Sequence, residues 1–209
     1  MSPASAQNRA SVLRIGVYGG AFDPPHLAHE ALARAAVQQH ALDRLLILPT
    51  GLAWHKASAL SAPEHRIAMA HLAFADVPQA RVDARETQRS GSSYTIDTLQ
   101  ALRLELPSVQ WFLLMGQDQL NFFPQWHRYA EILQIAILLV AFRADSMPAK
   151  SPNNPKNPVK IPHRIIQMPA MPQSASDIRQ RVAQSLGIDH LVKPAVARYI
   201  AQHHLYSPV

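Results

Sequence analysis

Short apolar runs alternate along the chain with longer stretches in which apolar residues recur every three or four positions. The short runs are rich in Val, Ile and Leu, and they predict strands near residues 14–18, 44–48, 81–84, 110–115, 136–142 and 164–168. The longer stretches predict helices near residues 26–39, 63–75, 95–105, 117–122, 126–134, 176–184 and 194–203. This alternation is typical of βαβ units. We therefore expect an α/β fold, a Rossmann-like doubly wound parallel sheet with a C-terminal helical segment.

The length of 209 residues is enough for one domain with a substantial apolar core. Residues 1–12 are mostly small and polar, and we expect them to form a disordered tail before a single domain over 13–209. Residues 145–163 are rich in Pro, Asn, Ser and Lys and are flanked by strand patterns. That composition predicts a mobile surface loop inside the domain.

Composition narrows the possible partners. The chain has no cysteine, which excludes disulfides, thiolate metal sites and cysteine nucleophiles. The first ten residues lack the apolar run of a secretory signal, and the longest apolar run, 135–142, is far shorter than the roughly 18 residues that span a bilayer. We expect a cytoplasmic protein without a membrane partner. A formal charge of +6 favours an anionic partner. Because the basic residues are scattered, we expect small nucleotides rather than a nucleic-acid polymer; the oligomeric state stays open.

The most informative segment follows the first predicted strand. That strand runs into Gly19 and Gly20, and a helical pattern begins near His26. Ligands bind at the carboxyl ends of parallel strands, and a helix N-terminus attracts anions. His26 and His29 are three residues apart and share one face of the first helical turn. The pair could bind phosphate, cap and pack the turn, or bind zinc; the neighbouring glycines favour phosphate.

Three later segments offer further candidates. Tyr94 lies in a polar turn where Ser93 or Thr95 could cap the next helix. Asp118 follows a buried strand, where an acidic residue can hold ribose hydroxyls. Ser174, Ser176 and Arg179 place hydroxyls and a guanidinium at a helix start, which predicts a second anion site facing the first. Taken singly, each segment also fits a purely structural role.

Together these segments resemble the motifs of nicotinate-mononucleotide adenylyltransferases, within the nucleotidylyltransferase superfamily. Residues 19–29 resemble the signature Gly-Gly-x-Phe-Asp-Pro-x-His-x-x-His, and the likeness extends from Gly16 to Tyr206. The resemblance implies that ATP donates AMP to nicotinate mononucleotide while Mg²⁺ neutralises the phosphates. Attack would be in line, without a covalent intermediate. Other phosphate acceptors (nicotinamide mononucleotide or phosphopantetheine) and a non-catalytic nucleotide-binding module are the alternatives.

The resemblance also assigns roles to residues. It implies ATP binding by Gly19, Gly20, Ala21, Phe22, His29, Asp118, Ser174, Ser176 and Arg179. It implies mononucleotide binding by Asp23, His55, Lys56, Ser93, Tyr94, Thr95, Trp126 (which would stack on the pyridine ring) and Arg143. It implies that His26, His29, Lys56 and Arg179 are catalytic. Arg66 is a weaker phosphate candidate.

The chain departs from the family pattern at three places. Residue 21 is Ala where a hydroxyl is usual, so only backbone donors remain there. Residue 28 is Ala where many relatives have Gly. Arg143-Ala144-Asp145 stands where Arg-Pro-Gly is commoner, and Asp145 would repel phosphate, which weakens the assignment of Arg143.

Overall fold

Six parallel strands form one sheet in the computed structural model, which describes residues 12–51, 60–143 and 160–207. The strands are β1 (Leu13–Gly20), β2 (Arg44–Pro49), β3 (Ala80–Val82), β4 (Val109–Gly116), β5 (Ala136–Arg143) and β6 (His163–Met168). Their order is β3-β2-β1-β4-β5-β6, and every neighbouring pair is parallel. Strands β2 and β3 are added on one side of β1 and strands β4 to β6 on its other side. The boundary between β1 and β4 is therefore the switch point at which such sheets bind ligands.

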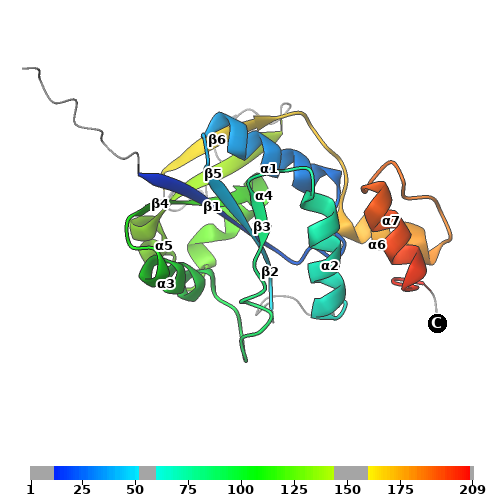
Figure 1. The fold of residues 1–209 in the computed structure, drawn as a ribbon. Coiled ribbons are helices and arrows are strands. Elements are labelled where there is room, and N and C mark those ends of the chain that lie inside the picture. The colour runs from blue at the N-terminus through cyan, green and yellow to red at the C-terminus, as the bar shows by residue number, and fades with distance from the viewer. Residues whose placement is uncertain (1–11, 52–59, 144–159, 208–209) are drawn as a thin grey trace, which may run out of the picture.

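Helices cover both faces of the sheet (Figure 1). One apolar cluster includes residues of α1 (Leu27–Gln39), α2 (Pro63–Phe74), α6 (Ala175–Ala183) and α7 (Pro194–Gln202). The other includes residues of α3 (Thr95–Glu105), the 3-10 helix η1 (Phe123–Gln125) and α5 (Tyr129–Ile135). Side chains alternate along β4 between the clusters: Trp111 and Leu113 point to the second, Phe112 and Leu114 to the first. The predicted fold class, including the C-terminal helical segment, is confirmed.

Several elements differ from their predicted bounds by a few residues at an end, and two of the differences have a clear local cause. The third strand covers Ala80–Val82 rather than 81–84, because residues 84–88 form a turn in which the carbonyl of Ala84 accepts from the N–H groups of Thr87 and Gln88. The helix predicted near 126–134 begins only at Tyr129. Trp126 is extended, with ψ of 143°, and Arg128 has φ of 53°, so the backbone leaves η1 before α5 starts. The short helix α4 (Gln117–Phe122) begins and ends where the sequence predicts.

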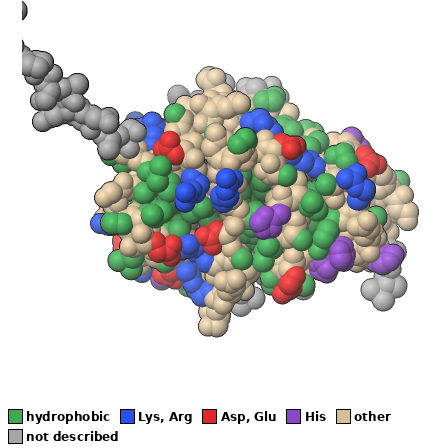
Figure 2. All heavy atoms as spheres, in the orientation of Figure 1, with side chains coloured by type: hydrophobic (Ala, Val, Ile, Leu, Met, Phe, Trp, Pro, Cys, Tyr) green, Lys and Arg blue, Asp and Glu red, His purple; other side chains and the backbone are tan. Residues whose placement is uncertain are grey.

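The predicted tail and loop lie mostly outside the described residues. Only residue 12 of the tail and residues 160–163 of the loop are described, and the latter lead into β6 with Ile161 buried. None of the helices within the described ranges is long and apolar enough to cross a membrane. On the face drawn in Figure 2, basic, acidic and apolar side chains are interspersed, and several histidines lie over α2 and α7.

Candidate active site

The two glycines that end β1 have different surroundings. A Cβ atom added at Gly19 would meet nothing within 4 Å, and the same holds at Gly116, which ends the neighbouring strand β4. A Cβ atom at Gly20 would lie 3.0 Å from the ring of Phe22. Gly19 and Gly116 thus leave space at the carboxyl edge of the two central strands, whereas Gly20 allows the chain to pass over a buried aromatic ring.

Phe22 anchors the turn after β1. Its φ is 48°, in the left-handed region that residues with a Cβ atom seldom adopt, and its side chain is buried. The ring packs edge-on against Tyr18 and Phe74, each at a centroid distance of 5.5 Å, and against His29 at 5.2 Å. Such packing can hold a backbone conformation that costs about 1–3 kcal/mol. The side chain of Phe22 therefore supports the turn, and only its backbone is left to contact a nucleotide.

His26 and His29 stand together at the start of α1. Their rings are stacked, with centroids 3.7 Å apart, and the backbone N–H of His26 donates to Nδ1 of His29 over 3.2 Å. His26 is the residue before the helix rather than its first residue. Burial lowers its pKa to about 4, so its imidazole is neutral near pH 7. The side chain of His26 in turn faces the backbone N–H of His29, which completes a capping box, and its Nδ1 atom is buried.

Asp23 is used inside the protein, contrary to its predicted contact with the mononucleotide. Its side chain is 3% exposed. One carboxylate oxygen accepts from the N–H of Ser61 at 3.0 Å, and the other accepts from the hydroxyl of Tyr206 at 2.6 Å. Because both oxygens already have donors in a buried position, this carboxylate fixes the turn rather than facing a ligand.

Arg66 also has a structural role, although it was a candidate for binding phosphate. Its side chain is 2% exposed. The guanidinium donates to the backbone carbonyls of Ser61 (3.0 Å), Ala21 (3.0 Å) and Thr50 (2.7 Å). Three separate segments are thereby joined to the start of α2. Burial lowers the pKa of the guanidinium, and the nearby Asp23 carboxylate opposes that shift.

The second predicted anion site meets the first. Ser174 precedes α6 and its hydroxyl accepts from the N–H of Asp177 at 3.1 Å, as expected for a helix cap. Arg179 donates to the backbone carbonyl of Asp23 at 2.7 Å and to the hydroxyl of Ser176 at 3.3 Å. A guanidinium and two helix N-termini therefore come together beside the turn after β1, which is an arrangement suited to phosphate.

The predicted pyridine-site residues also approach one another. Tyr94 lies just before α3, and its ring lies 4.5 Å from that of His127, the neighbour of Trp126. Trp126 is partly buried and packs against Phe123 at 5.3 Å. The segment that carries Trp126 and His127 therefore lies beside the Tyr94–Thr95 turn. Asp118 is exposed in the first turn of α4, directly after β4.

Ser93 does not cap α3, and neither does Thr95. The residue before the helix is Tyr94, without a side-chain cap, and Thr95 is the first helical residue. The hydroxyl of Ser93 is buried and donates to the carbonyl of Glu86 at 3.3 Å. Glu86 in turn accepts from the fully buried hydroxyl of Thr98 at 2.9 Å, and burial raises the pKa of its carboxyl. Ser93 and Glu86 therefore shape the turn that presents Tyr94.

Three candidates cannot be placed. His55 and Lys56 lie outside the described residues, and Arg143 is described only through its backbone, as the last residue of β5. Tyr206, Glu86 and His127 were not singled out from the sequence. Only contacts across the fold identify them, since Tyr206 and Asp23 are 183 residues apart.

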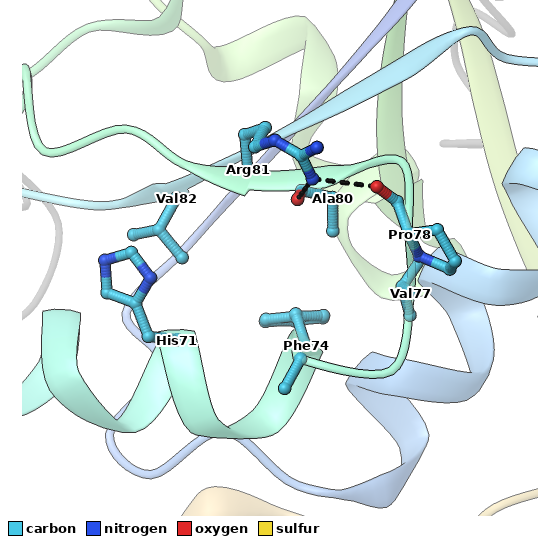
Figure 3. Close-up of a pocket in the computed structure, with 8 residues that line it drawn as sticks. His71, Phe74, Val77, Pro78, Ala80, Arg81 and Val82 are labelled. Carbon is cyan, nitrogen blue, oxygen red and sulfur yellow. Dashed lines mark hydrogen bonds between the residues drawn. The ribbon is translucent and has the colours of Figure 1, made fainter.

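A separate cavity of about 280 Å³ lies at the edge of the sheet (Figure 3). His71 and Phe74 of α2 face Val82 of β3 across it, and Arg81 donates to the carbonyls of Pro78 and Ala80. Its lining residues come from α2, from β3 and from the segment between them, and none of them is a predicted site residue. Its position is therefore distinct from the carboxyl edge of the central strands.

Comparisons with known proteins show which family this chain belongs to. A family model described as cytidylyltransferase-like matches residues 17–181. A probable nicotinate-nucleotide adenylyltransferase of Albidiferax ferrireducens is 50% identical over 194 residues, which cover 93% of this chain and 98% of that protein. The chain belongs to the nicotinate-nucleotide adenylyltransferase family. A second member, from Methylibium petroleiphilum, is 41% identical over 208 residues and covers 96% of each chain.

Solved structures show the fold of this family at greater distance. Plasmodium falciparum nicotinic acid mononucleotide adenylyltransferase complexed with NaAD aligns with a TM-score of 0.75 at 18% identity, covering 93% of this chain and 97% of that one.

Membership of the nicotinate-nucleotide adenylyltransferase family makes this protein a nucleotidyltransferase, and it confirms the resemblance found from residues 19–29 and the later motifs.

Proposed function

We propose that this protein transfers AMP from ATP to nicotinate mononucleotide, giving nicotinate adenine dinucleotide and pyrophosphate, a step of NAD biosynthesis. The observation that supports this most directly is the bond from Arg179 to the backbone carbonyl of Asp23. It joins the two motifs that the sequence assigned to phosphate, although they are 156 residues apart. The names of the close relatives support the choice of substrates.

In the proposed reaction, a phosphate oxygen of the mononucleotide attacks the α-phosphorus of ATP. A new P–O bond forms while the bond from the α-phosphorus to the bridging oxygen of pyrophosphate breaks. A phosphate monoester is largely ionised near pH 7, so no general base is required. Catalysis comes from aligning two anions and from stabilising charge on the phosphorus, for which Arg179, His26 and His29 are placed at the helix starts.

His26 would act as a neutral group, because its pKa is about 4 in the folded protein. A neutral imidazole keeps one N–H that could donate to a phosphate oxygen of the substrate. Lys56 and His55 would add charge from the segment after β2, and Gly19, Gly20, Ala21 and Phe22 would contribute backbone groups.

The mononucleotide would occupy the surface formed by the Tyr94–Thr95 turn and Trp126. Backbone N–H groups at the start of α3 would bind the pyridine carboxylate, and the indole would stack on the ring, an interaction of about 1 kcal/mol. Asp118, exposed after β4, would hold ribose hydroxyls of ATP. Ser174 and Ser176 would bind the β- and γ-phosphates.

Mg²⁺ would enter with the phosphates of ATP. The described residues contain no group of three or more His, Asp or Glu side chains that could hold a metal ion. Mg²⁺ keeps several waters and is commonly bound through substrate phosphates rather than by a protein cage. When bound, Mg²⁺ would neutralise phosphate charge.

A pyrophosphate-release assay with three acceptors tests the proposal. Nicotinate mononucleotide, nicotinamide mononucleotide and phosphopantetheine would each be supplied with ATP and Mg²⁺. We expect the highest kcat/KM for nicotinate mononucleotide. Faster turnover of phosphopantetheine would contradict the assignment of the Tyr94 and Trp126 surface, and no turnover of any acceptor would favour a binding module.

A further inference from the structure

The segment that follows α7 folds back toward the turn after β1. After α7 ends at Gln202, His204 and Tyr206 have φ values of 50° and 63°, both in the left-handed region. Leu205 and Tyr206 pack against the apolar cluster that contains Phe22. Residues with a Cβ atom hold such a conformation where surrounding contacts compensate for its cost. The packing of Tyr206 against this cluster is a contact of that kind.

Tyr206 reaches the centre of the candidate site. Its hydroxyl donates to the Asp23 carboxylate over 2.6 Å. Burial raises the pKa of the Tyr206 phenol far above its ordinary value, so the hydroxyl keeps its proton and remains a donor. Because the other Asp23 oxygen is held by the N–H of Ser61, the carboxylate is fixed from two sides.

The backbone of Asp23 connects this contact to the reacting groups. Its carbonyl oxygen accepts from Arg179, the guanidinium of the second anion site. Three residues later the chain reaches His26, which stacks on His29. The Asp23 carboxylate is buried and already has two donors, so an effect of its orientation on the reaction would pass through Arg179 and the histidines.

We propose that Tyr206 is a positioning residue that, through Asp23, holds Arg179 and His26 in the geometry required for adenylyl transfer. This inference rests on the proposed function. Tyr206 touches no reacting atom, and its role is to fix the turn on which Arg179 rests.

Other contacts hold α7 in place without Tyr206. Lys193, just before α7, pairs with Asp76 at 2.6 Å and with Glu30 at 3.1 Å. The hydroxyl of Tyr199 lies 3.0 Å from Nδ1 of His65 on α2. Removing the Tyr206 hydroxyl therefore leaves α7 anchored, and Tyr199 provides a matched control from the same helical segment.

The test compares Tyr206→Phe with Tyr199→Phe in the full chain. We expect Tyr206→Phe to lower kcat about tenfold, since small misplacements of catalytic groups reduce turnover, and to leave KM for ATP within about twofold. In the absence of substrate, the backbone amides of residues 21–30 should exchange with deuterium faster in Tyr206→Phe than in wild type. Tyr199→Phe should leave both kcat and this exchange within about twofold of wild type.

A double-mutant cycle separates positioning from a general loss of folded protein. In an Arg179→Ala background, Tyr206→Phe should lower kcat by a smaller factor than in the wild-type background, because the part of its effect that passes through Arg179 is already lost. The same tenfold loss in both backgrounds would overturn the proposal. So would wild-type kcat and wild-type exchange in Tyr206→Phe.

Two further arms keep the outcomes distinct. If Tyr206→Phe does not fold, Asp23→Asn replaces it, because this variant preserves the shape of the side chain and weakens the same contact. Asp23→Asn should give the same loss of kcat and the same faster exchange. Wild-type kcat and exchange in Asp23→Asn would overturn the proposal. If wild type adenylylates no acceptor, the proposed function fails. The exchange of residues 21–30 then still decides whether Tyr206 holds the turn.

Discussion

Replacing Arg66 by Met should destabilise the protein strongly, although Arg66 is no ligand. The variant keeps a long side chain but leaves the carbonyls of Ala21, Thr50 and Ser61 without their donor. Hydrogen bonds from charged groups contribute about 1.5–3 kcal/mol each, and the cost of burying the guanidinium offsets part of that. Breaking a buried charged network of this kind costs about 3–5 kcal/mol. We expect a loss of about 4 kcal/mol in the free energy of unfolding.

For a chain of this length, 1 kcal/mol corresponds to roughly 2–4 °C, so the Tm should fall by roughly 8–16 °C. Thermal unfolding followed by circular dichroism measures this directly. Arg81→Met is the matched control, because Arg81 is exposed and also donates to two backbone carbonyls. Its Tm should change by less than about 2 °C. A Tm for Arg66→Met within that same range would refute the reasoning that the three buried bonds hold the turn.

Three further predictions follow from the site. His29→Ala should lower kcat by roughly a hundredfold or more, whereas alanine at the exposed His190 should not; near-native turnover would remove His29 from the catalytic set. Trp126→Ala should raise KM for the mononucleotide much more than KM for ATP, and a selective loss of ATP binding would contradict stacking. The His26 pKa lies below its unfolded value of about 6.5, so its contribution to stability is present above pH 6.5 and lost as the pH falls toward 4. In urea unfolding, wild type should therefore lose about 2 kcal/mol more than His26→Asn between pH 7 and 4.5, and parallel losses would show that His26 is not buried in its neutral form.

Hydrophobic periodicity was sufficient to predict the strands and helices, because buried parallel strands and amphipathic helices leave strong local patterns. The errors fall where backbone conformation departs from the pattern. Arg128 in the left-handed region delays α5, and no spacing of apolar residues encodes that. The 3-10 helix before it ends in an extended Trp126, which the helical spacing of its neighbours concealed.

The site was predicted through its local motifs, and its long-range contacts were not. Asp23 was assigned to the mononucleotide through the family resemblance, and Arg66 was a phosphate candidate because Arg pairs with phosphate where a helix opens onto a cleft. Asp23 is bound by Ser61 and Tyr206 from other segments, and Arg66 donates to Ala21 and Thr50. Only the folded chain shows that both charges are buried and already hydrogen-bonded. The sequence predicted that the two anion-binding motifs face one another at one edge of the sheet. It did not predict the bond from Arg179 to the Asp23 carbonyl that joins them.

The central claim is that the α-phosphoryl group of ATP moves, with its adenosine, to the phosphate of nicotinate mononucleotide. Incubation of the protein with both nucleotides, Mg²⁺ and ATP labelled at the α-phosphorus tests it most directly. We predict label in a dinucleotide formed in equal amount with pyrophosphate, and no label on the protein. Label released as free AMP, attached to the protein, or remaining in ATP while the mononucleotide is unchanged would contradict the account.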